Sequence, residues 1–341
     1  MITIKDIAKK AGVSITTVSQ VLNRKEIGIK KETKERILRI AEELDYKPNY
    51  LARGLITKKT NTLGLIIPDI TNPFFPQVVR AIEDTGNHRN YNIILCNTDN
   101  NQEKEKLYLE ILQKKYVDGI ILTSSTRTTK DHGILLEKLK LPLVLLDRAA
   151  ASPFDFPSVY TCGYQGVMLG VNYLLKQGHR KIAYLSGPET SLVGKERLEG
   201  YMAALQNFGL TVNPQLIYYG DYKAETGEKG INELLEKDRN FTAVMAANDL
   251  MAVGAMRSIK NRQLKVPEDI SVLGFDNIQI SRLIDPALTT IHQPSYEMGK
   301  KATDMLIRLI EGKELEKRQV VLKPELLIRE SVAERRSQPS P

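Results

Sequence analysis

Near its start the chain reads Ala11-Gly12-Val13-Ser14-Ile15-Thr16-Thr17-Val18-Ser19-Gln20-Val21-Leu22-Asn23, a pattern typical of the turn and second helix of a helix-turn-helix. Gly12 can adopt the left-handed conformation that ends a preceding helix, because it has no Cβ. Ser14 can then cap the next helix by accepting a hydrogen bond from a free backbone N–H. The apolar residues that would form the buried stripe of that helix are Val18, Val21 and Leu22.

The other face of this predicted helix carries Ile15, Thr16 and Gln20. A recognition helix presents such a face to base edges in the major groove of DNA. Ordinary surface helices of unrelated folds show the same spacing, so the spacing alone leaves DNA binding and a structural role as alternatives.

Two further helices are predicted around this one. The first begins at Thr3, has Asp6 as its capping-box partner and runs through Lys10. The other spans about residues 31–44, and its inward stripe consists of Ile37, Ile40, Ala41 and Leu44. Three short helices make a head of about 45 residues, and so small a core predicts limited stability.

Positive charge is concentrated at this end of the chain. The 341 residues carry a formal net charge of +8. The first 60 residues hold 14 Lys or Arg and 7 Asp or Glu, which leaves 35 basic and 34 acidic residues in the other 281. A basic head on a nearly neutral body predicts a polyanionic partner for the head alone.

The segment after the head, residues 46–56, has two interpretations. It is either a plain linker or a short hinge helix, with Pro48 in its first turn, that forms when two copies pack together on DNA. In the second case Leu55 would insert between base pairs from the minor groove. Gly54 lowers helix stability by roughly 0.5–1 kcal/mol relative to Ala, which would make folding of this segment conditional.

From Thr62 onward, short apolar runs alternate with segments of helical period. The runs predicted as strands are 63–67, 93–95, 119–122, 143–146, 181–185, 215–219, 242–246, 270–275 and 288–291, with a last run at 320–322. The helices predicted between them are 75–85, 102–115, 134–139, 165–177, 195–208, 224–237, 249–261 and 295–311. This alternation predicts an α/β fold with two doubly wound parallel sheets, whose ligands bind beyond the carboxyl ends of the strands.

Several classes of protein are disfavoured. Two cysteines, Cys96 and Cys162, are too few for a disulfide framework or a metal cluster and fit a reducing cytoplasm. The four histidines lack zinc-binding spacing, and the glycines of 187–195 are too widely spaced for a phosphate loop. The start of the chain lacks the apolar region of a signal peptide, and no apolar run reaches the ~20 residues that span a bilayer. We therefore expect a cytoplasmic protein that is no enzyme and has no cofactor, metal or membrane partner.

The sequence resembles the lactose-repressor family of bacterial transcription regulators over nearly its whole length. The motifs in the head and linker are Ile4-Lys5-Asp6-Ile7-Ala8, Ala11-Gly12-Val13-Ser14, Thr17-Val18-Ser19, Leu22-Asn23 and Pro48-Asn49. Those in the body include Pro68-Asp69-Ile70-Thr71-Asn72-Pro73-Phe74-Phe75, Arg197-Leu198-Glu199-Gly200-Tyr201, Ala247-Asn248-Asp249 and Gly274-Phe275-Asp276. Together these motifs are highly specific.

The resemblance implies a helix-turn-helix head, a hinge helix and a core like the periplasmic sugar-binding proteins. The implied organisation is a head at 1–46, a hinge and linker at 47–61, a first subdomain at 62–160 with 292–322, a second at 161–291 with 323–330, and a polar tail at 331–341. It also implies a homodimer that binds a near-palindromic double-stranded operator, with a small-molecule effector in the cleft. The implied DNA-contacting positions are Thr3, Ser14, Ile15, Thr16, Thr17, Ser19, Gln20, Asn23, Asn49, Ala52, Arg53 and Leu55.

Polar side chains follow several of the predicted strands, where such a cleft would form. Carboxylates accept hydrogen bonds from sugar hydroxyls, Arg or amide groups donate them, and flat rings cover the apolar face of a sugar. Polar groups that gather at several strand ends are what a shaped polar pocket requires. The positions resemble the pentose-contacting set of ribose-binding proteins and ribose repressors. They are Asn72, Phe74, Phe75, Asp147, Arg148, Arg197, Tyr222, Asn248, Asp276 and Gln293.

Some of these residues have simpler explanations, and the sequence departs from the family in places. Phe74 and Phe75 could belong to the core, and Asp249 could be a helix N-cap rather than a ligand contact. Gln20 stands where members of the family often have Arg, and Gln suits adenine rather than guanine, which predicts a different operator. Cys162-Gly163 replaces a common Asp-Asn pair and weakens any claim for a contact there.

We predict a repressor of sugar-utilisation genes that a small sugar, such as ribose or a similar pentose, releases from its operator. Two alternatives remain. One is a catabolite-control regulator whose co-effector is a phosphoprotein or a sugar phosphate. The other is a purine-responsive repressor, since an Arg and an Asp can also bracket a base.

Overall fold

The structure is a computed structural model that describes residues 2–22, 28–46, 59–124, 130–148 and 153–335. The chain forms two compact units, residues 1–60 and 61–341. No helix within these described ranges is long and apolar enough to cross a membrane. The hinge helix predicted within 47–58 lies outside the described residues, as do the predicted DNA contacts Asn23, Asn49, Ala52, Arg53 and Leu55.

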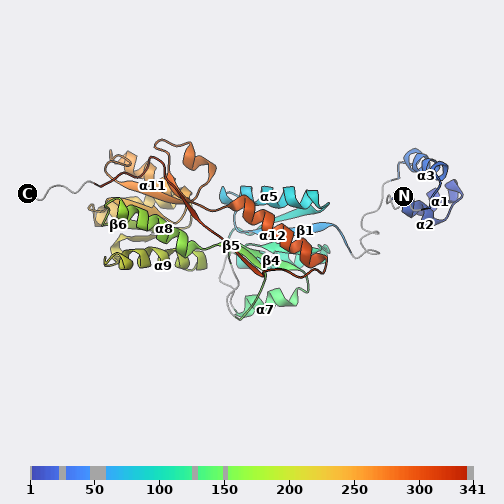
Figure 1. Ribbon diagram of the computed structural model, residues 1–341, viewed down its shortest axis with the longest axis horizontal. Coiled ribbons are helices and arrows are strands. Elements are labelled where there is room, and N and C mark those ends of the chain that lie inside the picture. Colours follow the sequence, from blue (N-terminus) through green and yellow to red (C-terminus); the bar gives the residue numbers. More distant parts are fainter. Residues whose placement is uncertain (1, 23–27, 47–58, 125–129, 149–152, 336–341) are drawn as a thin grey trace, which may run out of the picture. The chain divides into compact units, whose positions relative to one another are not determined.

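The first unit is a bundle of three helices, α1 (Ile4–Ala11), α2 (Ile15–Leu22) and α3 (Lys31–Glu43) (Figure 1). All three supply one apolar cluster, whose buried members are Ile7, Ala8, Ala11, Val18, Val21, Ile37, Ile40 and Ala41. Two predicted members of the stripes, Leu22 and Leu44, are only partly buried at the edge of this cluster.

Local hydrogen bonds set the bounds of α1 and α2, as the sequence predicts. Gly12 has a φ of 64°, and the next N–H, that of Val13, donates to Ala8 O at 3.1 Å. The Asp6 carboxylate accepts from the Thr3 N–H at 2.8 Å. At the start of α2, Ser14 Oγ accepts from the Thr17 N–H at 3.0 Å. These contacts confirm the predicted turn and both predicted caps.

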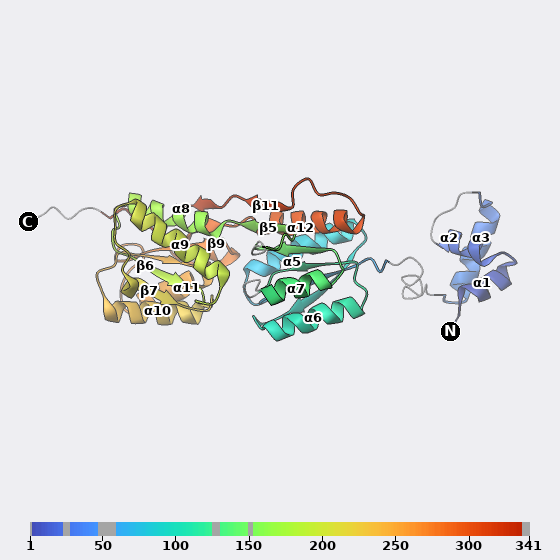
Figure 2. The same cartoon turned by 90° about the horizontal axis from the view of Figure 1, so that it is seen from below.

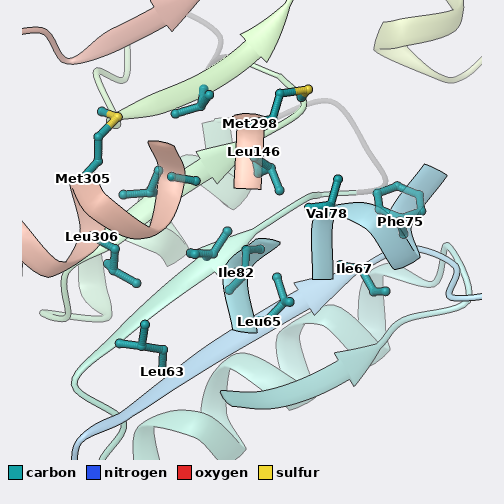
Figure 3. Close-up of a cluster of buried hydrophobic side chains, with 14 of the residues drawn as sticks. Leu63, Leu65, Ile67, Phe75, Val78, Ile82, Leu146, Met298, Met305 and Leu306 are labelled. Carbon is teal, nitrogen blue, oxygen red and sulfur yellow. The ribbon is translucent and has the colours of Figure 1, made fainter. Parts of the chain in front are cut away.

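The second unit begins with a six-stranded parallel sheet. Its strands, in spatial order, are β11 (Gln319–Leu322), β5 (Ser158–Thr161), β4 (Leu143–Leu146), β3 (Gly119–Leu122), β1 (Thr62–Ile67) and β2 (Asn92–Asn97). Helices α5 (Phe74–His88) and α12 (Ser295–Ile310) cover one face, and α6 (Gln102–Lys114) and α7 (Lys130–Lys138) cover the other (Figure 2). Figure 3 shows side chains of β1, α5 and α12 meeting in one buried cluster.

The second sheet has the same plan. Its strands, in spatial order, are β12 (Glu325–Leu327), β10 (Thr289–His292), β9 (Ser271–Asp276), β8 (Ala243–Ala246), β6 (Ile182–Ser186) and β7 (Ile217–Tyr219). Helices α8 (Gly163–Lys176) and α9 (Leu192–Asn207) pack on one face, and α10 (Ala224–Lys237) and α11 (Asp249–Asn261) on the other. Only the edge strand β12 runs antiparallel, against β10. The predicted fold of two parallel, doubly wound sheets behind a helix-turn-helix is confirmed.

The chain crosses between the two sheets three times, after β5, after β10 and after β11. We propose subdomain boundaries within one residue of these crossings. The first subdomain then comprises 62–160 and 292–322, and the second comprises 161–291 and 323–330.

Residues 331–335, which the sequence assigns to a polar tail, are instead fixed to the second sheet. Ser331 is wholly buried, and its Oγ donates to Val272 O at 2.6 Å and accepts from the Thr289 N–H at 2.8 Å. Further on, the Arg335 N–H donates to Gln177 O at 2.7 Å. Polar composition misled the prediction here, because a hydroxyl that has backbone partners can be buried at little cost.

Candidate functional site

Helix α2 has an exposed face as well as a buried one. The predicted DNA contacts in the described head, apart from Thr3 at the start of α1, lie on α2 and its N-cap: Ser14, Ile15, Thr16, Thr17, Ser19 and Gln20. Ile15 is 45% exposed although it is apolar, and Thr16 and Gln20 are exposed beside it. An exposed helix start on a small basic bundle can place side chains against base edges and N–H groups against phosphates.

Replacing Ser14 with Ala should destabilise the head by about 1 kcal/mol, because the Thr17 N–H loses its side-chain acceptor. Amide hydrogen exchange of the α2 peptide in the full chain measures the change. Thr16→Ala is the control, since Thr16 is exposed on the same helix and does not cap it. Equal exchange in both variants would contradict this role of Ser14.

In the second unit, a cavity of about 320 Å³ is lined by residues of both subdomains. It brings together all ten residues that the sequence predicts as effector contacts: Asn72, Phe74, Phe75, Asp147, Arg148, Arg197, Tyr222, Asn248, Asp276 and Gln293. They come from separate strand ends and helix starts, as expected where the carboxyl ends of parallel strands meet.

Arg197, on α9, is the most enclosed cation of the cavity, with a side chain 5% exposed. Its guanidinium lies over the ring of Phe275, 3.9 Å from the centroid, and its Nη1 donates to Ala247 O. Its Nη2 lies 3.7 Å from Asp276 Oδ1. Its buried Nε has no hydrogen-bond partner in the described part of the chain. An unpaired buried donor is costly to the folded protein.

Arg148 provides a second cation with unused donors. It follows β4, and its Nη2 lies 3.9 Å from the carboxylate of Asp147, with both side chains about one-tenth exposed. Its buried Nε and Nη1 have no hydrogen-bond partner among the residues that the structure describes. Burial raises the pKa of Asp147, against the lowering effect of Arg148 and Arg197.

Asp276, the last residue of β9, is the acceptor opposite Arg197. Its Oδ1 accepts from Gln293 Nε2 at 2.7 Å. Burial raises the pKa of this carboxyl to about 7, although Arg197 and the hydrogen bond from Gln293 act in the opposite direction. Asp276 also has a φ of 112°, a conformation that a residue with a Cβ rarely adopts.

Aromatic side chains from both subdomains line the cavity. Phe74 and Phe75 are each 5% exposed and meet edge to face, with ring centroids 5.2 Å apart. They belong to the core cluster of the first subdomain, in which Figure 3 shows Phe75, and they also line the cavity, so the two interpretations of these residues are compatible. On the second subdomain, Tyr222 packs against Gly187, where a Cβ would lie 2.2 Å from the ring. The backbone at 187 must therefore remain glycine for the ring to keep its place.

At the start of α11, Asp249 has neither of the two roles that the sequence suggests for it, helix N-cap or ligand contact. Asn248 is the N-cap: its Oδ1 accepts from the Met251 N–H at 2.9 Å, and its Nδ2 donates to Tyr222 O at 2.9 Å. Asp249 is therefore not the cap. It is wholly buried behind the cavity rather than in its lining.

Sequence reasoning missed part of the lining. The additional residues are Pro68, Asp69, Thr71, Asn100, Pro188, Thr190, Ser191, Val193, Asp221, Lys223 and Leu250. Most of them lie in loops that follow β1, β2, β6 and β7, so applying the strand-end argument to every strand would have found them.

Chemically, the side chains that line the cavity include two guanidinium groups, buried carboxyl groups and aromatic rings. Such a set can bind a compact molecule with several hydroxyl or ring-nitrogen groups. In the described ranges, no group of His, Cys, Asp and Glu is placed to hold a metal ion.

Two sequence families match the chain. The family described as "Bacterial regulatory proteins, lacI family" matches residues 3–49. The family described as "Periplasmic binding proteins and sugar binding domain of LacI family" matches residues 60–330. Together these matches span the three-helix head and both subdomains.

Individual relatives match over almost their full length. The HTH-type transcriptional repressor PurR of Pasteurella multocida is 38% identical over 335 residues, which are 98% of this chain and 100% of the relative. The ribose operon repressor of Halalkalibacterium halodurans is 37% identical over 331 residues, 97% of each chain. Among solved structures, the lac repressor dimer bound to operator and the anti-inducer ONPF superposes with a TM-score of 0.88 at 29% identity. That match covers 97% of this chain and 99% of the other.

Proposed function

Because the chain belongs to the LacI family of bacterial transcription regulators, we propose that it represses sugar-utilisation genes and leaves its operator when a small sugar binds in the cleft. Members of this family are DNA-binding regulators rather than enzymes. They bind operator DNA and small-molecule effectors and act as dimers. Operator DNA, an effector and a second copy of the chain are therefore the partners of this protein.

The proposal of a sugar effector rests on the unpaired donors of the cavity. Arg148 and Arg197 present three buried N–H positions without a partner in the described chain, close to the carboxylates of Asp147 and Asp276. Vicinal hydroxyls can accept from such N–H groups and donate to such carboxylates at the same time. A free pentose such as ribose supplies these hydroxyls without adding charge to a buried site. The relative named a ribose operon repressor supports the same choice.

A purine is the second candidate effector. The relative named PurR is 38% identical to this chain, and the rings of Phe74 and Tyr222 line the cavity on opposite subdomains. Two rings can stack on a planar base, while an Arg and an Asp bond its edge. Buried carboxylates at Asp147, Asp276 and nearby Asp249 make a negatively charged sugar phosphate the less favourable ligand.

We propose that the effector acts by closing the cleft. Both subdomains line the cavity, so a ligand that bonds to Arg148 and Arg197 favours the arrangement in which they approach. In a dimer, this change would shift the first subdomains, separate the predicted hinge helices and release Leu55 from the minor groove. The ligand can shift this balance only by its preference for one of the two states.

One titration series tests the effector. We expect calorimetry of the full chain to detect binding of ribose or a similar pentose. Binding of hexoses, sugar phosphates and purines should be weak or undetectable. A palindromic operator selected from random duplexes should then lose affinity for the protein when that sugar is added, and affinity should fall steeply with salt.

Each other outcome has a defined meaning. Tight binding of a purine or a sugar phosphate would replace the pentose with that alternative. A sugar that strengthens operator binding would reverse the proposed sign of regulation. Equal affinity for palindromic and random duplexes, at every salt concentration and with every ligand, would overturn the proposal altogether.

A further inference from the structure

We propose that Asp249 is a positioning residue of the effector site, which holds the strained turn at Asp276 and Asn277 from behind the cavity. The inference rests on the proposed function, since it concerns how the ligand-facing carboxylate of Asp276 is kept in place. Asp249 itself does not line the cavity. Asp249 would therefore affect ligand binding only through the residues that it contacts.

The turn that carries Asp276 needs an external support. Asp276 has a φ of 112° and Asn277 a φ of 59°, so two consecutive residues with a Cβ occupy left-handed backbone conformations. Asn tolerates such a conformation, but Asp276, with the larger φ, occupies a region that persists only where the surrounding structure fixes it. The turn thus depends on contacts from elements outside β9.

Asp249 provides that support through two hydrogen bonds from distant parts of the chain. Its Oδ2 accepts from the Ile278 N–H, the first amide after the strained pair, at 2.8 Å. Its Oδ1 accepts from Thr290 Oγ1 in β10 at 2.5 Å. Asp249 and Thr290 are both 0% exposed, so neither bond is exchanged with water. The side chain therefore ties α11 to the end of β9 and to the neighbouring strand.

The sheet is shaped to admit this carboxylate. A Cβ on Gly274, two residues before Asp276 in β9, would lie 2.2 Å from Asp249 Oδ1. Only glycine leaves room for the carboxylate to reach past the strand to the turn. Burial is the larger cause that raises the pKa of Asp249, and the nearby charge of Asp276 is the second. Asp249 occupies this position although its anionic form is unfavourable there, which fits a local role of its oxygens as hydrogen-bond acceptors.

Asn248, the residue before Asp249, supports the part of the cavity wall at Tyr222 in a similar way. Asn248 Nδ2 donates to the backbone carbonyl of Tyr222, which has a φ of 69°. The two residues at the start of α11 thus contact both left-handed segments that present ligand groups from the second subdomain. A helix start is a rigid base for this purpose, because its backbone is fixed by the helix itself.

Three variants and one control separate positioning from general stability. Asp249→Ala removes both acceptors, whereas Asp249→Asn keeps one oxygen for the Ile278 N–H and offers an amide to Thr290 Oγ1. Thr290→Val removes one of the two bonds with little change of shape. Thr303→Val is the control, because Thr303 is equally buried and its hydroxyl bonds only to Gly299 O within α12, at 2.9 Å.

Two measurements are made on the full chain. The first is hydrogen exchange at the Ile278 amide without ligand, which we expect to speed up about tenfold or more in Asp249→Ala. The second is the dissociation constant for ribose, the probe, at a temperature well below the melting point of each variant. It should rise about tenfold or more in Asp249→Ala, less in Thr290→Val and little in Asp249→Asn or Thr303→Val.

The outcomes separate this inference from the proposed function. Unchanged exchange at Ile278 in Asp249→Ala, or faster exchange with unchanged ribose affinity, would overturn the positioning role. If Asp249→Ala does not fold, the comparison of Thr290→Val with Thr303→Val decides the matter by the same two measurements. If the wild-type chain binds no ribose, the proposed effector is wrong, and the exchange at Ile278 still decides whether Asp249 holds the turn.

Discussion

Replacing Arg197 with Ala is expected to weaken ribose binding by about 100-fold or more while operator binding persists. The reason is its position: the buried guanidinium has an unpaired Nε and lies 3.7 Å from Asp276. The substitution removes a cation that lines the cavity and leaves the buried carboxylate without that positive charge. The head is a separate compact unit, so its contacts with DNA do not include this residue.

Calorimetry with ribose and a gel shift with the selected operator measure the two effects on the same preparation. Arg180→Ala is the matched control, because Arg180 also lies over an aromatic ring, that of Phe208 at 4.7 Å, and lies outside the cavity. It should change neither measurement. Retained ribose binding in Arg197→Ala would remove this residue from the effector site. Simultaneous loss of operator binding would mean that its role is structural.

Asp276→Asn is expected to make the protein more stable above pH 7 and at the same time less able to bind ribose. Asn has nearly the same shape as Asp and tolerates left-handed backbone. It lacks the charge whose burial raises the pKa of this carboxyl to about 7. Ribose affinity should fall about tenfold or more, because the amide can accept fewer hydroxyl bonds than the carboxylate.

The stability difference depends on pH in a defined direction. The folded pKa of about 7 is higher than the ordinary value of 3.8, so ionisation of Asp276 is less favourable in the folded state than in the unfolded state. Its contribution to stability is fully present below about pH 4 and is lost as the pH rises through 7. The Asn variant does not have this loss. Its free energy of unfolding should therefore exceed that of the wild type by on the order of 4 kcal/mol at pH 8, and match it near pH 4.

Denaturant unfolding between pH 4 and 8 checks this difference. Asp238→Asn is a control of opposite sign, because a backbone hydrogen bond from Asn240 lowers the pKa of Asp238 in the folded protein. The free energy of unfolding of Asp238→Asn, relative to that of the wild type, should not increase as the pH rises. Parallel pH profiles for the wild type and Asp276→Asn would show that the buried carboxylate is not the source of the effect.

Several features of the site followed from local patterns. The turn at Gly12, the cap at Ser14 and the buried stripe of α2 depend on residues at most five apart in sequence, so short-range rules suffice for them. The position of the cavity could be predicted with a rule that is almost as simple. Polar residues after buried parallel strands gather at one sheet edge, which brought Asp147 and Asp276 together although they are far apart in the chain.

Other features could not be predicted, because they depend on partners that are distant in sequence. The roles of Asn248 and Asp249 are set by Tyr222, Ile278 and Thr290, and no spacing within α11 indicates them. The strands β5 and β12 were missed as well. They are four and three residues long, and β12 exists as an edge strand only because β10 is there to pair with it.

The amino-acid sequence by itself determined the three-helix head, the two doubly wound sheets and ten of the side chains that line the cleft, since periodicity and the positions of strand ends can be recognised in short segments. Only the tertiary structure decided which of those side chains are left with unpaired hydrogen-bonding groups and which have partners in the fold. It also decided that Ser331 is buried and that Asp249 lies behind the cavity. The physical reason is that the free energy of a buried polar group depends on the atoms around it, and those atoms come from parts of the chain that local sequence does not specify.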